Sequence, residues 1–176
     1  MQKIVITGGP GTGKTTIINE LERIGYACMH EISRKVTTMA RKNGIEQLFL
    51  KEPLLFSKLL LEGRISQYQE SLKINAEYVF FDRGIPDVHA YMNYMGINYP
   101  KIYIDESKKK TYNTIFLMPP WEAIYITDSE RYESFEQALA IHNHLKNTYE
   151  LLNYKTIEVP VGNVTQRVDF ILKSLI

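Results

Sequence analysis

The sequence predicts an α/β fold in which five strands form a mainly parallel sheet covered by helices on both faces. Segments with strand and helix patterns alternate along the chain, with no internal repeat, low-complexity tract or linker. The residues Gly8-Gly9-Pro10-Gly11-Thr12-Gly13-Lys14-Thr15 match the phosphate-binding pattern G-x-x-x-x-G-K-[ST] at every fixed position. The chain of 176 residues has the length of a single domain, residues 1–176. Together these observations predict the three-layer sandwich of P-loop NTPases.

The first elements surround this glycine-rich motif. Residues 3–7 are a β-branched run suited to a buried strand, and residues 14–24 carry apolar side chains at helical spacing before Gly25. A short strand is expected at 26–30, followed by a helix at 31–43 that Gly44 ends and by a loop at 45–52. The motif therefore has the strand–loop–helix context of a true phosphate site.

The middle of the chain predicts a long helix and a central strand. Pro53 suits the first turn of a helix running to about residue 75. Residues 78–82 are apolar at successive positions, as in a parallel strand buried on both faces. A helix is expected at 87–94, and residues 100–105 form an insert that is either helical or extended.

The last third begins with a strand at 113–118, which Pro119-Pro120 closes. Residues 121–132 lack a clean period and predict a loop or lid, with lid bounds of about 119–133. Ser134 is expected to cap a helix ending near 152, with Gln137 completing a capping box. A final strand at 155–159 and a helix at 163–175 complete the fold.

Composition narrows the classes of partner. The net charge of +1 predicts no general attraction to nucleic acid or to anionic membranes. The single cysteine, Cys28, excludes an intramolecular disulfide and is expected to be a buried structural thiol in a reducing, cytoplasmic environment. No apolar run reaches membrane-spanning length, and the first strand starts too early to leave space for a signal peptide.

The glycine-rich motif predicts binding of a nucleoside triphosphate. Its backbone N–H groups and the following helix N-terminus would hold phosphate oxygens, Lys14 would bridge the β- and γ-phosphates, and the Thr15 hydroxyl would bind Mg²⁺. The alternative is an ordinary glycine-rich turn. No Asn-Lys-x-Asp guanine-reading motif is present, which favours ATP. The expected nucleotide-binding residues are Gly8, Gly9, Pro10, Gly11, Thr12, Gly13, Lys14, Thr15 and Thr16.

Asp82 ends the central strand, and Arg83 follows it. An acidic residue at this place orients Mg²⁺ or its waters in P-loop proteins, because Mg²⁺ prefers oxygen ligands. Arg83 could make a two-pronged contact with an acceptor or a phosphate. The alternative is a strand-terminal Asp that caps the following turn.

Four segments carry a family resemblance: residues 8–15, 30–34, 80–87 and 116–121. In order and spacing they resemble the single-domain, AAA-labelled P-loop family that is similar to the nicotinamide riboside kinase domain of bacterial NAD regulators. The wider resemblance is to P-loop nucleoside and nucleotide kinases. It implies the sheet order 2-3-1-4-5 and a kinase-like site with a lid.

The resemblance implies that Glu31 accepts the proton of the attacking hydroxyl. Glu31 should converge with Asp82 and Lys14, because the carboxyl ends of parallel strands meet at one edge of the sheet. The alternative is a first-turn helix acid with Arg34 as its i+3 partner. Arg34 would either hold Glu31 or bind substrate.

The resemblance also implies that the lid supplies an arginine to the transferred phosphate, and Arg131 is the candidate. The alternative is a solvent-facing charge. Trp121 and Tyr125, four residues apart, would either stack on a substrate ring or anchor the lid in the core.

Two functions remain open. The first is an ATP- and Mg²⁺-dependent kinase whose partners are a nucleoside triphosphate and a small hydroxylated acceptor, with nucleosides such as nicotinamide riboside among the candidates. The second is a nucleotide-dependent switch that acts through a protein or phosphoinositide partner. A ring-forming AAA+ motor is disfavoured, because such motors add a helical domain after the α/β core, and the sequence carries no signal of oligomeric state.

Overall fold

The computed structural model describes residues 1–42, 44–124 and 134–175. Their strands form one parallel sheet in the order β2-β3-β1-β4-β5, which confirms the order that the resemblance implied. The strands are β1 (Gln2–Gly8), β2 (Ala27–Met29), β3 (Tyr78–Asp82), β4 (Thr114–Met118) and β5 (Thr156–Glu158).

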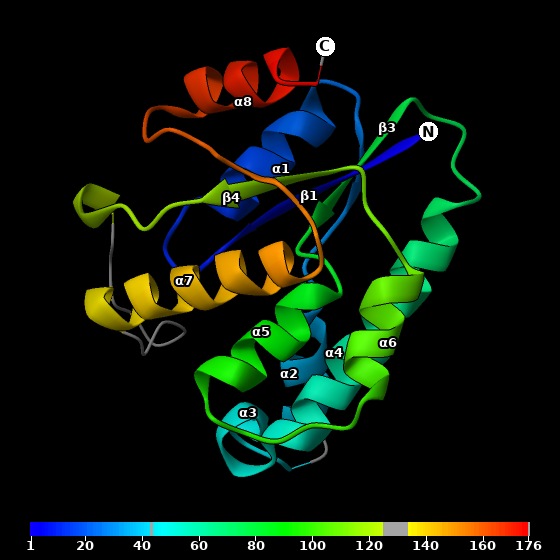
Figure 1. Cartoon of the computed structure of the whole chain (residues 1–176), viewed down its shortest axis with the longest axis vertical. Helices are drawn as coiled ribbons and strands as arrows, with labels where there is room; N and C mark the ends of the chain where they lie inside the picture. Colours follow the sequence, from blue (N-terminus) through cyan, green and yellow to red (C-terminus); the bar gives the residue numbers. More distant parts are fainter. Residues whose placement is uncertain (43, 125–133, 176) are drawn as a thin grey trace.

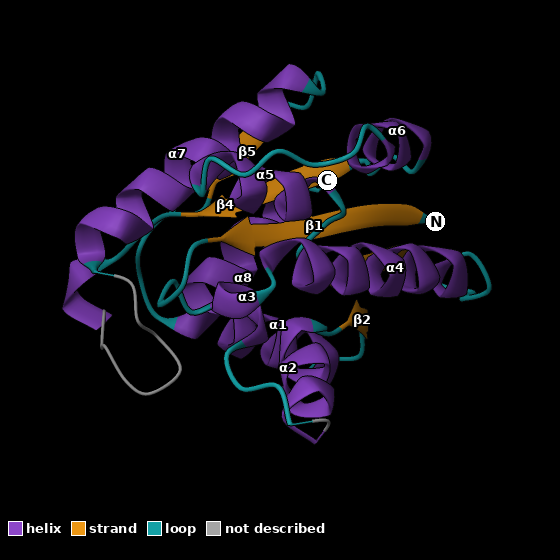
Figure 2. Cartoon of the chain, turned by 90° about the horizontal axis from the view of Figure 1, so that it is seen from below, coloured by secondary structure: helices purple, strands orange, loops and turns teal. Residues whose placement is uncertain are grey.

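Helices cover both faces of the sheet, as the three-layer prediction requires (Figure 2). The helices are α1 (Lys14–Arg23), α2 (Ser33–Lys42), α3 (Leu48–Lys51), α4 (Pro53–Ser71), α5 (Pro86–Tyr94), α6 (Ile102–Lys109), α7 (Phe135–Leu151) and α8 (Val164–Lys173), with a short 3₁₀ turn, η1 (Glu122–Ile124).

Two features differ from expectation, and the structure decides one open alternative. The segment 45–52 is not all loop, because α3 forms there. The insert near 100–105, expected to be helical or extended, is helical as part of α6. Leu48 is buried, and the Phe49 ring lies 6.2 Å from that of Phe56, so packing against α4 holds a helical turn that is too short to be stable alone. The long helix α4 also ends at Ser71 rather than near residue 75.

The core follows the alternation of β1. Ile4 and Ile6 point to one face, where they pack with residues of α1 and α8. Val5 points to the other face and packs with Tyr149 of α7. All four side chains have no exposed area, so β1 is buried on both faces as expected for the central strand of a parallel sheet.

A separate apolar cluster holds together the five helices α2, α3, α4, α5 and α6. These helices extend away from the sheet, with α3 at the far end (Figure 1). Its buried members include Val36, Leu48, Leu60 and Tyr103. The predicted capping box is confirmed at α7, where Ser134 and Gln137 exchange side chain–backbone hydrogen bonds. Within the described residues, no helix is both long and apolar enough to cross a membrane.

Candidate functional site

The glycine-rich loop connects β1 to α1. Gly8 has φ 154° and Gly13 has φ 81°, in the region of backbone conformation that favours glycine. A Cβ at Gly8 would lie 2.6 Å from the carbonyl oxygen of Met118, and one at Gly13 would lie 3.0 Å from Nη1 of Arg167. The loop can therefore take this shape only with glycine at these two positions.

Lys14 begins α1 and points back over the loop. Its Nζ donates to the carbonyl oxygen of Gly9 at 2.6 Å and to Oγ1 of Thr12 at 3.2 Å. Burial, together with the nearby positive charge of Arg83, lowers the pKa of Lys14 to about 7. An anion bound in the loop would supply the negative charge that this buried ammonium needs. Thr15 and Thr16 follow it in the first turn of α1 and are exposed.

Asp82 ends β3 beside β1, in register with Ile6. The side chain is buried, and its Oδ1 has no hydrogen-bond partner among the described residues. Burial and the charge of Glu31 raise the pKa of Asp82. A hard cation would satisfy both the orphaned oxygen and the charge, so Asp82 fits the Mg²⁺ role that the sequence predicts. The described residues contain no group of three or more His, Cys, Asp or Glu side chains that could hold a metal, whereas Mg²⁺ in phosphoryl transfer needs only one or two carboxylates.

Arg83 is held in an unusual backbone conformation, with φ 75°. Its Nε donates to Oε2 of Glu31 at 2.7 Å, and its Nη1 donates to Oδ1 of Asp87 at 3.2 Å. The guanidinium also lies over the ring of Tyr91, 5.3 Å from its centre. Three contacts, one from the segment before α2 and two from α5, therefore fix the direction of this cation.

Glu31 lies between β2 and α2 and carries two arginine contacts. Besides Arg83, Nη2 of Arg64 lies 3.5 Å from its Oε1. Burial alone would raise the pKa of Glu31, but Arg83 and Arg64 outweigh it and lower the pKa to about 2. Oε1 also accepts a hydrogen bond from the backbone N–H of Ser33 at 3.4 Å, so Glu31 serves the first turn of α2 as well.

Asp87 is a site residue to which the sequence analysis gave no role. It has no exposed area, and it accepts hydrogen bonds from Oγ1 of Thr7 at 2.5 Å and from the Tyr149 hydroxyl at 2.6 Å. The backbone N–H of Gly84 donates to the same carboxylate at 3.1 Å. Asp87 thus connects β1, the loop after β3 and α7, and fixes the position of Arg83.

Two buried arginines were also missed. Arg64 of α4 donates to the carbonyl oxygen of Gly84 at 2.9 Å, and Arg167 of α8 donates to the carbonyl oxygen of Thr12 at 2.9 Å. Neither lies in a motif. Arg64 is one of several charged residues on α4, so its burial has no signal in the sequence.

These groups close the inner end of a cavity of about 640 Å³. Glu31, Arg64, Arg83 and Asp87 line it, and Pro10 of the glycine-rich loop borders it. The remaining walls are side chains of α2, α3, α4 and α5 together with Gln137 of α7. The structure therefore brings Glu31 and Arg83 to a cavity that begins at the glycine-rich loop.

The other predicted substrate residues have different outcomes. Arg34 of α2 lines this cavity. Trp121 lies between β4 and η1 and is not among the described residues that line the cavity. Arg131 and Tyr125 lie outside the described residues, as does most of the expected lid.

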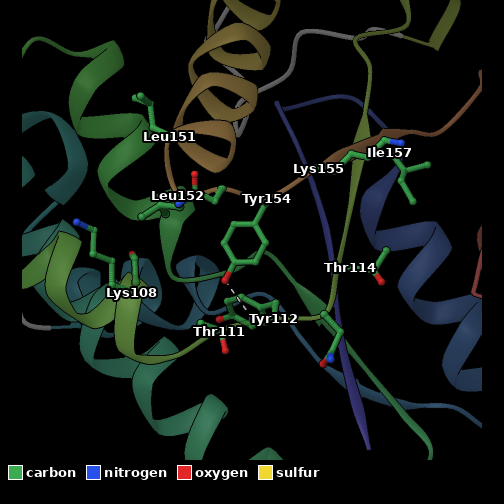
Figure 3. Close-up of a pocket in the computed structure, with 12 residues that line it drawn as sticks. Lys108, Thr111, Tyr112, Thr114, Leu151, Leu152, Tyr154, Lys155 and Ile157 are labelled. Carbon is green, nitrogen blue, oxygen red and sulfur yellow. Dashed lines mark hydrogen bonds between the residues drawn. The ribbon is translucent and has the colours of Figure 1, made fainter.

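A second cavity, of about 790 Å³, lies at the opposite edge of the sheet (Figure 3). It surrounds the starts of β4 and β5, where Tyr154 accepts a hydrogen bond from the backbone N–H of Tyr112 at 3.1 Å. None of the predicted site residues lines it. Ligands of open parallel sheets bind at the carboxyl ends of the strands, so we assign the functional site to the smaller cavity.

Comparison with known proteins identifies the family of the chain and relatives of its fold. A family model described as an AAA domain matches residues 3–167. The chain belongs to this AAA-domain family. The match ends at Arg167, so it includes every site residue described above.

Solved structures of kinases share the fold of this AAA-domain protein. Deoxyadenosine kinase from M. mycoides, solved with products, has a TM-score of 0.72 and 17% identity over 99% of this chain and 98% of that chain. Thymidylate kinase from Candida albicans has a TM-score of 0.69 and 14% identity, and the match covers 99% of this chain and 90% of that chain. NadR, solved with NAD and AMP-PNP, has a TM-score of 0.67 and 19% identity over 99% of this chain and 48% of NadR, so the chain spans about half of that protein. No curated protein sequence matched the chain.

Proposed function

We propose that the protein is an ATP- and Mg²⁺-dependent kinase that phosphorylates a hydroxyl group of a small nucleoside-like metabolite in the cytoplasm. The observation that carries this proposal is the shared boundary of two sites: Pro10 of the phosphate-binding loop lines the cavity whose inner end holds Glu31 and Arg83. A phosphoryl donor on the loop and an acceptor in the cavity would then meet at this carboxylate–arginine pair. The kinase folds found by comparison, including NadR solved with NAD and AMP-PNP, support it.

Residues Gly8 to Thr16 would hold the triphosphate, with Lys14 on the β- and γ-phosphates. The Thr15 hydroxyl and the Asp82 carboxylate would hold Mg²⁺, which supplies positive charge that offsets the charge of the phosphates when bound. Asp82 suits this role because its Oδ1 is buried without a described partner.

Glu31 would orient the acceptor hydroxyl and take its proton. The hydroxyl oxygen forms a bond to the γ-phosphorus as the bond from that phosphorus to the bridging oxygen of ADP breaks. A carboxylate with a pKa near 2 is a weak base, but in a loose transition state the proton leaves late and positioning contributes most of the effect. Arg83, fixed by Asp87, would stabilise the charge on the transferring group.

Arg34, Trp121 and Arg131 complete the proposal. Arg34 lines the cavity and would contact the acceptor. Arg131 would bring a further positive charge to the transferred phosphoryl group, and Trp121 would stack on a ring of the substrate.

The test is ADP formation from Mg·ATP, with and without a pool of nucleosides and related hydroxylated metabolites. We expect one pool to stimulate turnover, and we expect Lys14→Ala and Glu31→Gln to abolish the stimulation. Lys58→Ala and Glu62→Gln are matched controls, because both side chains are exposed on α4 and should leave turnover unchanged. Tight nucleotide binding without stimulation by any pool would refute the kinase proposal and favour the switch that acts through a protein or phosphoinositide partner.

A further inference from the structure

The cavity has a long axis, because three helices contribute lining residues at successive turns. On α4 the residues run from Arg64 through Leu60 and Ser57 to Pro53. Eleven residues of helix span about 16 Å, so the cavity extends far beyond the carboxylate–arginine pair at its inner end. A nucleoside bound with its hydroxyl at that pair would therefore direct its ring toward the outer end.

Aromatic side chains line this path. The rings of Phe49 and Phe56 lie 6.2 Å apart and belong to α3 and α4. Tyr91 of α5 contributes a third ring from the opposite wall. Such walls favour a flat ring between the two ends of the cavity.

The outer end carries a charge that the proposed transfer reaction does not use. Arg41 lies on the same face of α2 as Arg34, two turns and about 10 Å farther from Glu31. Among the described residues that line the cavity, Arg41 is the only charged one at the outer end, and Thr38, Leu50 and Met95 line the cavity as well. An arginine and a hydroxyl beside apolar walls form a favourable place for an anion.

The formal charges of the described lining residues point the same way. The arginines at positions 34, 41, 64 and 83 outnumber the acids Glu31 and Asp87, which leaves two excess positive charges. The whole chain has a net charge of only +1. Basic side chains thus outnumber acidic ones among the described lining residues, which favours a negatively charged acceptor.

We propose that the acceptor is a ring-bearing alcohol with an anionic group, a carboxylate or a phosphate, on the ring side, and that Arg41 binds this group. The inference rests on the proposed kinase function and specifies its substrate class. Neutral nucleosides fill the same space but leave Arg41 without its ligand, so they are poorer acceptors.

The experiment compares two pyridine ribosides that differ only in a ring carboxylate or a ring carboxamide. We expect kcat/KM to be at least tenfold higher for the carboxylate, and we expect Arg41→Met to remove this preference. Lys42→Met is the matched control, because Lys42 shares the exposed last turn of α2 but does not line the cavity, and it should keep the preference. Arg41→Lys should retain part of it.

Benzoate and phenyl phosphate, added as competitors, distinguish the two anions, since the better inhibitor identifies the group and should lose its advantage in Arg41→Met. Phosphorylation of both ribosides with equal kcat/KM, or a preference that survives Arg41→Met, would overturn the inference and leave the kinase proposal standing. Failure of every riboside and every nucleoside pool to stimulate turnover would overturn both.

Discussion

The hydroxyl of Tyr149 should contribute substantially to stability, and Tyr149→Phe removes it alone. The hydroxyl has no exposed area and donates to Oδ2 of Asp87 at 2.6 Å. Without it, that oxygen keeps the backbone N–H of Gly84 at 3.1 Å, and the aromatic ring retains its packing. A hydrogen bond to a charged group contributes about 1.5–3 kcal/mol, so we expect a loss of about 2 kcal/mol in the free energy of unfolding.

The measurement is chemical denaturation followed by circular dichroism, with the slope against denaturant unchanged. The melting temperature should fall by roughly 4–8 °C for a domain of this size. Tyr99→Phe is the control, because it removes an exposed hydrogen bond to Asn93 and should cost far less. Equal losses in the two variants would refute the idea that Asp87 depends on Tyr149.

Three further outcomes are expected. Gly84→Ala places a Cβ 2.5 Å from the Tyr149 hydroxyl, so the substitution should destabilise the fold strongly. Adding Tyr149→Phe should partly restore the stability of Gly84→Ala. If the losses in unfolding free energy of the two single variants simply add in the double variant, the close contact is contradicted. Burial lowers the pKa of His89 from its usual 6.5 to about 4, so the unfolding free energy should fall by about 3 kcal/mol as the pH drops through this window. His89→Gln should flatten that part of the plot of unfolding free energy against pH. An unchanged plot would contradict a buried neutral imidazole at position 89. Burial also raises the pKa of the Cys28 thiol to about 12, so maleimide labelling at pH 8, followed by mass spectrometry, should be slow in the folded protein and fast in denaturant; fast labelling of the folded protein would contradict the burial.

The sequence predicted the sheet well where local and tertiary preferences agree. The residues of β1 and β3 are apolar at successive positions, and the structure buries both strands in the centre of the sheet. The short helix α3 was missed because tertiary packing, and not the local sequence, determines its structure. Its four residues have no helical period of their own, and burial of Leu48 against neighbouring helices stabilises the turn.

The same division holds for the site. Lys14, Glu31 and Asp82 each follow a strand, so the geometry of a parallel sheet predicts that they converge. Arg64 and Tyr149 lie inside long helices that carry other polar residues as well, so nothing in the local sequence marks these two as buried. Only the packing of α4 and α7 against the loop after β3 brings them to Glu31 and Asp87.

The two halves of the site have different origins in the chain. The phosphate-binding half is one continuous stretch, from Gly8 to Thr16, fixed in place by backbone geometry. The walls of the cavity come instead mostly from the four helices α2 to α5, spread over residues 33–94, with Gln137 of α7 added. The short helix α3 contributes its side chains from a turn that depends on packing. For the proposed kinase, engineering can treat these halves as separate modules. Substitutions on the outer turns of α2, α3 and α5 would then change the acceptor that is selected and leave the nucleotide donor unchanged.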